Sequence, residues 1–123
     1  PIFDDVEASA YYYQAIGIAK KLGIAAGDEN NRFNPRENIS RQDMMVLTAK
    51  ALEKKGLVDS EVSASLLNRF NDQRDIAQYA VQSAATLLKE GLIAGDGGKL
   101  RPRTQTTRAE AAAFLYNIYN RYE

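Results

Sequence analysis

The stretch "TTRAEAAAFL", residues 106–115, places a threonine, an arginine and a glutamate at the head of an alanine-rich run. Thr107 and Glu110 have the spacing of a capping box, in which side chains satisfy free N–H groups of the first helical turn. The stretch therefore predicts a helix that starts at Thr107. Arg108 is less expected there, because the positive end of the helix dipole disfavours a cation unless an anion lies close by.

The combination of a capping residue, an arginine and an acidic residue occurs twice, at residues 40–43 and 107–110, within a longer repeated pattern. The landmarks fall in one order in both copies, with two small changes of length: Phe3 with Phe70, Asp5 with Asp72, Tyr11 with Tyr79, Gly23 with Gly91, Gly27-Asp28 with Gly95-Asp96, Pro35-Arg36 with Pro102-Arg103, and Arg41 with Arg108. Coincidence poorly explains so many ordered matches, so we expect two copies of one structural unit. The copies occupy residues 1–55 and 70–123, with residues 56–69 between them.

Each copy is predicted to form a helix, a loop and a second helix. Gly23 and Gly91 follow apolar positions at helical spacing, where a helix commonly ends in the left-handed conformation. The second helices are expected to start at Ser40 and Thr107. No segment alternates convincingly with the period of a strand, so the predicted fold is all-α. The residues expected on buried helix faces are Tyr12, Ala15, Ile16, Ala19, Leu22, Met44, Met45, Thr48, Ala51, Leu52, Ala80, Ala84, Leu87, Leu88, Ala111, Phe114, Leu115, Ile118 and Tyr122.

The connecting segment, residues 56–69, carries a weaker signal. Asp59 and Ser60 are both suitable caps for a short helix that runs through Leu66 and Leu67. We therefore expect one short helix between the two copies.

The composition excludes several classes of function. The 123 residues suit one compact domain, and 16 basic residues balance 16 acidic ones, so no net field attracts nucleic acid or an anionic bilayer. No apolar run approaches the ~20 residues of a membrane span. Cysteine and histidine are absent, which removes thiolate metal sites and the commonest general base. The chain opens directly on a motif, so we expect it to be a piece of a longer protein.

Two kinds of site are suggested only superficially. Asp28 and Asn30 begin a pattern like a calcium loop, but Arg32 takes the next ligand position and Phe33 stands where the turn needs glycine. No pattern places a pair of carboxylates, of the kind that glycosidases use, in one cleft. We expect no metal site, no cofactor and no catalytic activity.

The order of landmarks resembles the S-layer homology domain of bacterial surface proteins. The resemblance rests on Phe-x-Asp, an aromatic residue opening the first helix, the segments "GIAAGD" and "GLIAGD", and "TRAE" at residues 107–110. It covers nearly the whole chain as two tandem units. The first copy departs from it with "SRQD" at residues 40–43, and Tyr11 and Tyr79 stand where the family usually has tryptophan.

The resemblance implies an extracellular location in the cell wall or S-layer and a pseudo-threefold spindle of three such units, with the second helices at its centre. Grooves between neighbouring units would hold an anionic secondary cell-wall polysaccharide, commonly one bearing an acidic pyruvate ketal, and so anchor the parent protein without a covalent bond. Because this chain has two units, the third neighbour is expected to be an adjacent unit or a second chain, which would make a homo-oligomer. The alternative function is a structural module that pairs chains and binds no glycan.

Arg108 and Arg41 are the first candidate ligand residues. An arginine beside free backbone N–H groups at a helix start can hold both oxygens of a carboxylate. The repeated position favours this role over the alternative, a solvated arginine that pairs with a nearby carboxylate.

Two further matched pairs are candidates for glycan binding. Tyr11 and Tyr79 are either packing residues or platforms for a sugar ring, and the sequence does not choose between these roles. Asp5 and Asp72 favour a role as caps of a turn or of the first helix. Their alternative role is to bind sugar hydroxyls or to orient the arginine.

Gly27 and Gly95 complete the candidate set. Each lies in a predicted tight turn, and each is expected to leave the backbone open to a ligand as a secondary role. Phe3 and Phe70 open the two repeats. We expect both in the core and assign them no chemical role.

Overall fold

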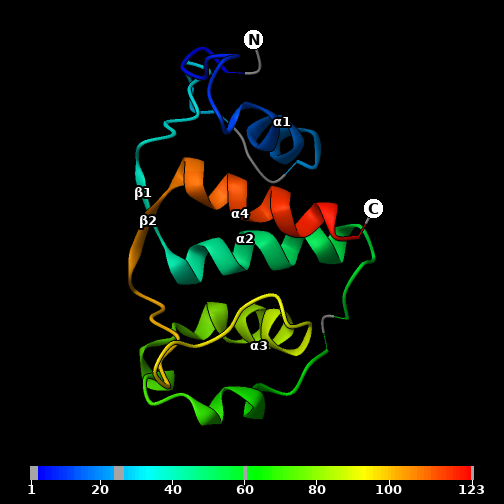
Figure 1. Ribbon diagram of the computed structural model, residues 1–123, viewed down its shortest axis with the longest axis vertical. Coiled ribbons are helices and arrows are strands. Elements are labelled where there is room, and N and C mark those ends of the chain that lie inside the picture. The colour runs from blue at the N-terminus through cyan, green and yellow to red at the C-terminus, as the bar shows by residue number, and fades with distance from the viewer. Residues whose placement is uncertain (1–2, 24–26, 60, 123) are drawn as a thin grey trace. The chain divides into compact units, whose positions relative to one another are not determined.

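The computed structural model describes residues 3–23, 27–59 and 61–122. Over these residues helices are the main regular structure, beside one small two-stranded sheet, which confirms the predicted all-α class (Figure 1). Within the same ranges no helix is long and apolar enough to cross a membrane. The elements are, in chain order, α1 (Tyr13–Lys21), β1 (Asn38–Ser40), α2 (Arg41–Lys54), the short 3-10 helices η1 (Ala64–Arg69), η2 (Gln73–Asp75) and η3 (Gln78–Ala80), then α3 (Val81–Lys89), β2 (Gln105–Thr107) and α4 (Arg108–Asn120).

The chain divides into two compact units that interleave the two sequence repeats. Unit 1 combines Pro1–Ile39 with Thr106–Glu123, and unit 2 is Ser40–Gln105. Within unit 1, α1 packs against α4, and within unit 2, α2 packs against α3 (Figure 1). Each second helix therefore packs against the first helix of the other repeat.

We call this pairing of each second helix with the other repeat the exchange. In unit 1, backbone hydrogen bonds at the start of α4 account for it. The N–H of Arg108 donates to the carbonyl of Glu37 at 2.9 Å, and the N–H of Ala109 donates to the carbonyl of Pro35 at 2.9 Å. A helix leaves the N–H groups of its first turn without partners inside the helix. The loop of the first repeat supplies those partners to the second helix of the second repeat.

Unit 2 contains the same arrangement with the repeats exchanged. The N–H of Arg41 donates to the carbonyl of Thr104 at 2.8 Å, and the N–H of Gln42 donates to that of Pro102 at 2.9 Å. These four residues match those of unit 1 in the repeat alignment. The exchange is therefore a property of the repeated sequence and not of one copy.

The predicted caps of the second helices are confirmed. Ser40 accepts from the N–H of Asp43 at 3.2 Å, and Thr107 accepts from the N–H of Glu110 at 3.1 Å. The Glu110 carboxylate in turn accepts from the hydroxyls of Thr106 and Thr107. With the loop carbonyls, these caps give partners to the first three N–H groups of each second helix.

The predicted ends of the first helices are also confirmed. Gly23 and Gly91 have φ of 75° and 70°, the left-handed conformation that glycine adopts without a steric cost. After α3, the N–H of Leu92 donates to the carbonyl of Leu87 at 2.9 Å, which is the longer bond of a Schellman motif.

The buried faces of the helices are largely those that the spacing of apolar residues predicts. In unit 1, Phe3, Val6, Ala15, Ile16, Phe33 and Ala112 form one buried cluster. Of the expected buried residues in the described part of the chain, Tyr12, Leu88, Phe114 and Tyr122 are half-buried and the others are buried. Tyr12 packs on the edge of the unit 1 cluster.

Two local features differ from the sequence-based expectation. β1 and β2 pair as a two-stranded sheet, and each has three residues, which is shorter than the roughly 4–8 residues over which alternation is recognisable. The connecting helix η1 is capped by Ser63, whose side chain accepts from the N–H of Ser65 at 3.3 Å. The prediction that Asp59 caps this helix was wrong, because the Asp59 carboxylate accepts from the N–H of Glu61 instead. The other predicted cap, Ser60, lies outside the described residues.

Phe3 and Phe70 are core residues, as predicted, and each ring lies against a glycine of its own repeat. A Cβ on Gly27 would stand 2.8 Å from a ring atom of Phe3, and one on Gly95 would overlap the ring of Phe70. Glycine is therefore required at both positions because of the neighbouring ring.

We expect Gly95→Ala to lower the free energy of unfolding by about 1–3 kcal/mol, because the added methyl group overpacks against the Phe70 ring. Chemical denaturation of Gly95→Ala, Phe70→Leu and the double variant measures the coupling between the two sites. The smaller leucine should recover part of the loss.

Gly91→Ala is the matched control. It costs about 1–2 kcal/mol through its positive φ, but nothing lies within 4 Å of the added atom, so Phe70→Leu should not rescue it. Equal coupling in both pairs would contradict the proposed ring contact.

Candidate functional site

The side chain of Arg108 is anchored at one end by Phe33. Its Nε donates to the Phe33 carbonyl at 2.9 Å, and the carbon of the guanidinium lies 4.5 Å from the centre of the Phe33 ring. Both residues belong to unit 1. The structure gives the two terminal nitrogens of this guanidinium no partner among the residues that it describes.

Asp5 fixes the backbone that carries this acceptor. Its two carboxylate oxygens accept from the N–H groups of Phe33 and Asn34, both at 2.8 Å. The peptide that faces Arg108 is thus held from its other side. Asp5 therefore ties the loop and, through Phe33, orients the arginine.

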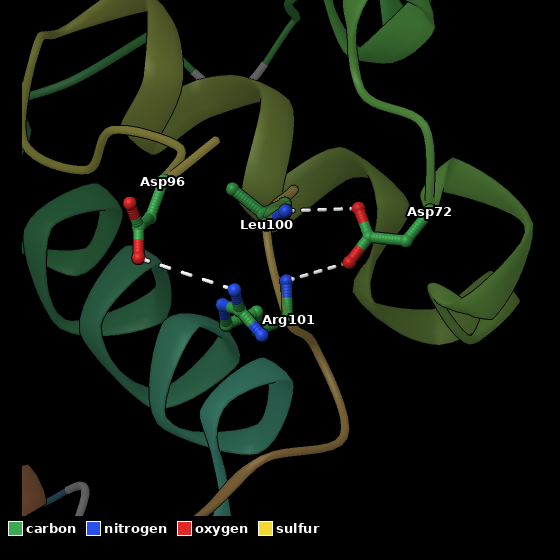
Figure 2. A network of polar contacts seen from close by, with 4 residues as sticks. All are labelled: Asp72, Asp96, Leu100 and Arg101. Atoms are coloured by element: carbon green, nitrogen blue, oxygen red, sulfur yellow. Dashed lines mark hydrogen bonds and ion pairs between the residues drawn. The ribbon is translucent and has the colours of Figure 1, made fainter. Parts of the chain in front are cut away.

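Asp72 holds the matching loop of unit 2 by the same pair of contacts, as Figure 2 shows. Its carboxylate oxygens accept from the N–H groups of Leu100 and Arg101, both at 2.8 Å, while the Arg101 guanidinium lies 4.0 Å from the Asp96 carboxylate. Burial alone would raise the pKa of Asp72, but the bonds from Leu100 and Arg101 outweigh it and lower this pKa below its ordinary value.

Arg41 occupies the position in unit 2 that Arg108 has in unit 1. Its Nε is buried and has no hydrogen-bond partner. Among the described arginines, Arg101 pairs with Asp96 and Arg103 pairs with Asp75. Pairing of Arg41 or Arg108 with a nearby carboxylate, the alternative drawn from the sequence, is therefore not observed among these residues.

The expectation of free backbone N–H groups beside each arginine was wrong. At the start of α4, the N–H groups of Arg108, Ala109 and Glu110 donate to Glu37, Pro35 and Thr107. The matching groups of α2 are occupied in the same way. An anion at either helix start would therefore meet the arginine side chain and not a set of open backbone donors.

The two candidate tyrosines are exposed but differ in their contacts. Tyr79 is 62% exposed and donates its hydroxyl to the Asp43 carboxylate at 2.5 Å. This hydrogen bond raises the pKa of Tyr79. Tyr11 is 77% exposed and lies edge-on to Tyr12, with ring centres 5.0 Å apart. Exposed faces of this kind are available to stack on a sugar ring.

Gly27 and Gly95 are each closed on one side by an aromatic ring. The side on which a Cβ would stand is filled at Gly27 by the Phe3 ring and at Gly95 by the Phe70 ring. A ligand cannot approach either glycine from that side.

A pocket in unit 1 includes residues that the sequence did not single out. It has a volume of about 400 Å³ and is lined by Asp5, Glu7, Ala10, Tyr12, Asn34, Pro35, Arg36 and Glu37. Tyr12 lines it, whereas the neighbouring Tyr11 does not. The matched Pro-Arg dipeptide, Pro35-Arg36 with Pro102-Arg103, is the sequence signal that could have identified this loop.

Comparison with known families decides what this repeated arrangement is. Residues 2–45 and 69–112 each match the model of the S-layer homology domain. The chain belongs to this family. Both matches reach from the Phe-x-Asp segment into the first turns of the second helix, so they include the loop carbonyls, the cap and the arginine of each repeat.

The relatives of this S-layer homology domain chain are large proteins of several kinds. It is 33% identical over 118 residues to the exoglucanase XynX of Acetivibrio thermocellus, covering 94% of this chain and 10% of that protein. It is 32% identical over 117 residues to an amylopullulanase of Thermoanaerobacterium thermosulfurigenes, covering 94% and 6%. It is 30% identical over 115 residues to an S-layer protein of Bacillus licheniformis, covering 94% and 12%.

The chain thus spans about a tenth of the length of these relatives. Enzymes and S-layer proteins share it, which places the common part at the cell surface as an anchoring module. The S-layer homology domain itself is non-catalytic.

We expect Asp72→Asn to lower the free energy of unfolding by about 1–3 kcal/mol at neutral pH, because an amide cannot accept from two N–H groups as a carboxylate does. The folded pKa of Asp72 lies below its ordinary value of 3.8. The ionised group therefore stabilises the fold above that pH, and this contribution is lost as the pH falls through the lowered folded pKa.

Urea midpoints of wild type and variant across this acidic range test the expectation. The difference should be full at neutral pH and should shrink below about pH 4. Asp96→Asn is the control, since its carboxylate is 89% exposed and 4.0 Å from Arg101, and it should change stability little. A variant difference that stays constant down to the lowest pH would contradict the role of the ionised Asp72.

Proposed function

We propose that the chain anchors its parent protein by binding an anionic secondary cell-wall polysaccharide, with Arg108 as the principal receptor of the polymer's carboxylate and Arg41 as a second one. The observation that carries the proposal is the state of the Arg108 guanidinium. Its Nε end is fixed to Phe33, while its terminal nitrogens have no partner within the described residues. A fork held in this way is suited to a bidentate contact with a carboxylate.

The electrostatics of the helix start supports the same assignment. A cation in the first turn is disfavoured by the helix dipole, and the cap carboxylate of Glu110 is engaged by threonine hydroxyls. A ligand carboxylate at Arg108 would offset this cost. We take a pyruvate ketal on the polymer as the source of that carboxylate.

The remaining candidates supply the contacts to sugar rings. Tyr11 and Tyr79 offer exposed aromatic faces, and the pocket lined by Tyr12 and Arg36 offers a concave surface in unit 1. Asp5 and Asp72 act indirectly in this proposal, because both oxygens of each carboxylate hold loop N–H groups.

We expect Arg108→Lys to weaken binding to the wall polymer about tenfold, since a point charge cannot reproduce two parallel hydrogen bonds. The measurement is sedimentation of the purified chain with polysaccharide-bearing sacculi. Arg121→Lys, at the other end of the same helix, is the matched control and should bind as wild type does.

Stripping the polymer from the sacculi, or removing only its acidic groups, should abolish sedimentation of the wild-type chain, and rising salt should weaken it. Sedimentation that survives stripping would favour the alternative, a module that associates with protein chains and not with glycan. Loss on stripping but not on removal of acidic groups would indicate a neutral glycan.

The proposal includes a third neighbour, either an adjacent unit of the parent protein or a second copy of the chain. A helical repeat generally needs about three units or polar caps to close its core.

For the isolated chain we expect a melting temperature that rises with protein concentration, because association stabilises the folded state by mass action. Sedimentation velocity over the same concentrations measures the oligomer directly. A chain that stays monomeric, with a constant melting temperature, would show that two repeats close their own core.

A further inference from the structure

The two matched arginines are held differently in their units. In unit 1, Phe33 gives Arg108 both a carbonyl acceptor at 2.9 Å and an aromatic face at 4.5 Å. In unit 2, the residue at the matching position is Leu100, which has no ring. There the Nε of Arg41 is buried without a hydrogen-bond partner.

The backbone around the two arginines is otherwise the same. Asp5 holds the N–H of Phe33 at 2.8 Å, and Asp72 holds that of Leu100 at 2.8 Å. The N–H groups of both arginines donate to matching loop carbonyls, at 2.9 Å in unit 1 and 2.8 Å in unit 2. With these contacts matched, the side chain at position 33 or 100 is the difference that lies directly against the guanidinium in unit 1.

We infer that Phe33 is a positioning residue that preorganises Arg108, and that the Arg108 site consequently binds an acidic sugar more tightly than the Arg41 site. The inference rests on the proposed function. It adds that the two repeats are unequal receptors and names the residue that makes them so.

The physical reason is the cost of ordering a long side chain. The Phe33 ring attracts the guanidinium, and the Phe33 carbonyl occupies Nε, so Arg108 presents its terminal nitrogens in one orientation before a ligand arrives. Arg41 lacks both restraints, so neither a ring nor a carbonyl fixes the orientation of its guanidinium before a ligand arrives. Ordering one such side chain corresponds to a difference of roughly 2- to 12-fold in affinity.

The first arm of the test needs no ligand. In a proton–nitrogen spectrum of the arginine Nε–H groups, assigned by loss of one signal in Arg108→Lys and in Arg41→Lys, the Arg108 signal should be shifted by the aromatic ring current. The Arg41 signal should not be shifted. Phe33→Leu should remove the shift, and Phe33→Tyr, which keeps the ring, should retain it.

The second arm measures each site separately by titration. The probe is a methyl glycoside carrying a pyruvate ketal, with its methyl ester as the neutral control. The Arg108 signals should saturate at a probe concentration roughly 2- to 12-fold lower than the Arg41 signals. Phe33→Leu should make the two sites saturate at similar probe concentrations. In the Arg108→Lys background, Phe33→Leu should cause no further loss of affinity.

The outcomes separate this inference from the proposed function. Equal saturation at the two sites, or an unshifted Arg108 signal in the free wild-type chain, would overturn the inference while leaving polymer binding intact. Failure of wild type to bind the acidic probe, or equal binding of its methyl ester, would refute the proposed function and the inference with it. Because Phe33 is buried, Phe33→Leu is expected to lower stability, and the wild-type spectra and Phe33→Tyr then decide the matter.

Discussion

The interaction on which the structure depends is the exchange of backbone hydrogen bonds between the two repeats. The first two N–H groups of each second helix donate to loop carbonyls of the other repeat, Glu37 and Pro35 in unit 1 and Thr104 and Pro102 in unit 2. Helix starts need such partners wherever water is excluded. Because these partners come from the other repeat, each compact unit contains a part of both copies.

This exchange also decides how an anion can be recognised. Open N–H groups at a helix start are a common receptor for phosphate or carboxylate, but the loops and caps occupy them here. An anion must therefore be bound by the arginine side chain, and the orientation of the guanidinium then affects how well it binds. In unit 1 that orientation follows from a chain of contacts in which Asp5 holds Phe33 and Phe33 holds Arg108.

The local features followed from the sequence because their causes are local. Caps at Ser40 and Thr107, glycine ends at Gly23 and Gly91, and apolar spacing each depend on a few neighbouring residues. The exchange could not be predicted in this way, since two copies with the same pattern do not reveal which loop meets which helix. The roles of Asp5 and of the rings over Gly27 and Gly95 depend on contacts between distant segments, and those appear only in the folded chain.

The division of the chain has a consequence for the order in which it folds during synthesis. Unit 2 is continuous from Ser40 to Gln105, so its contacts can form as soon as that segment has left the ribosome. Unit 1 contains a hydrogen bond between Tyr116 and Gln14, which are 102 positions apart. The packing of α1 against α4 must therefore wait until α4 has been synthesised. Because unit 2 lies between these two helices in the sequence, unit 1 is completed only after unit 2 has been made.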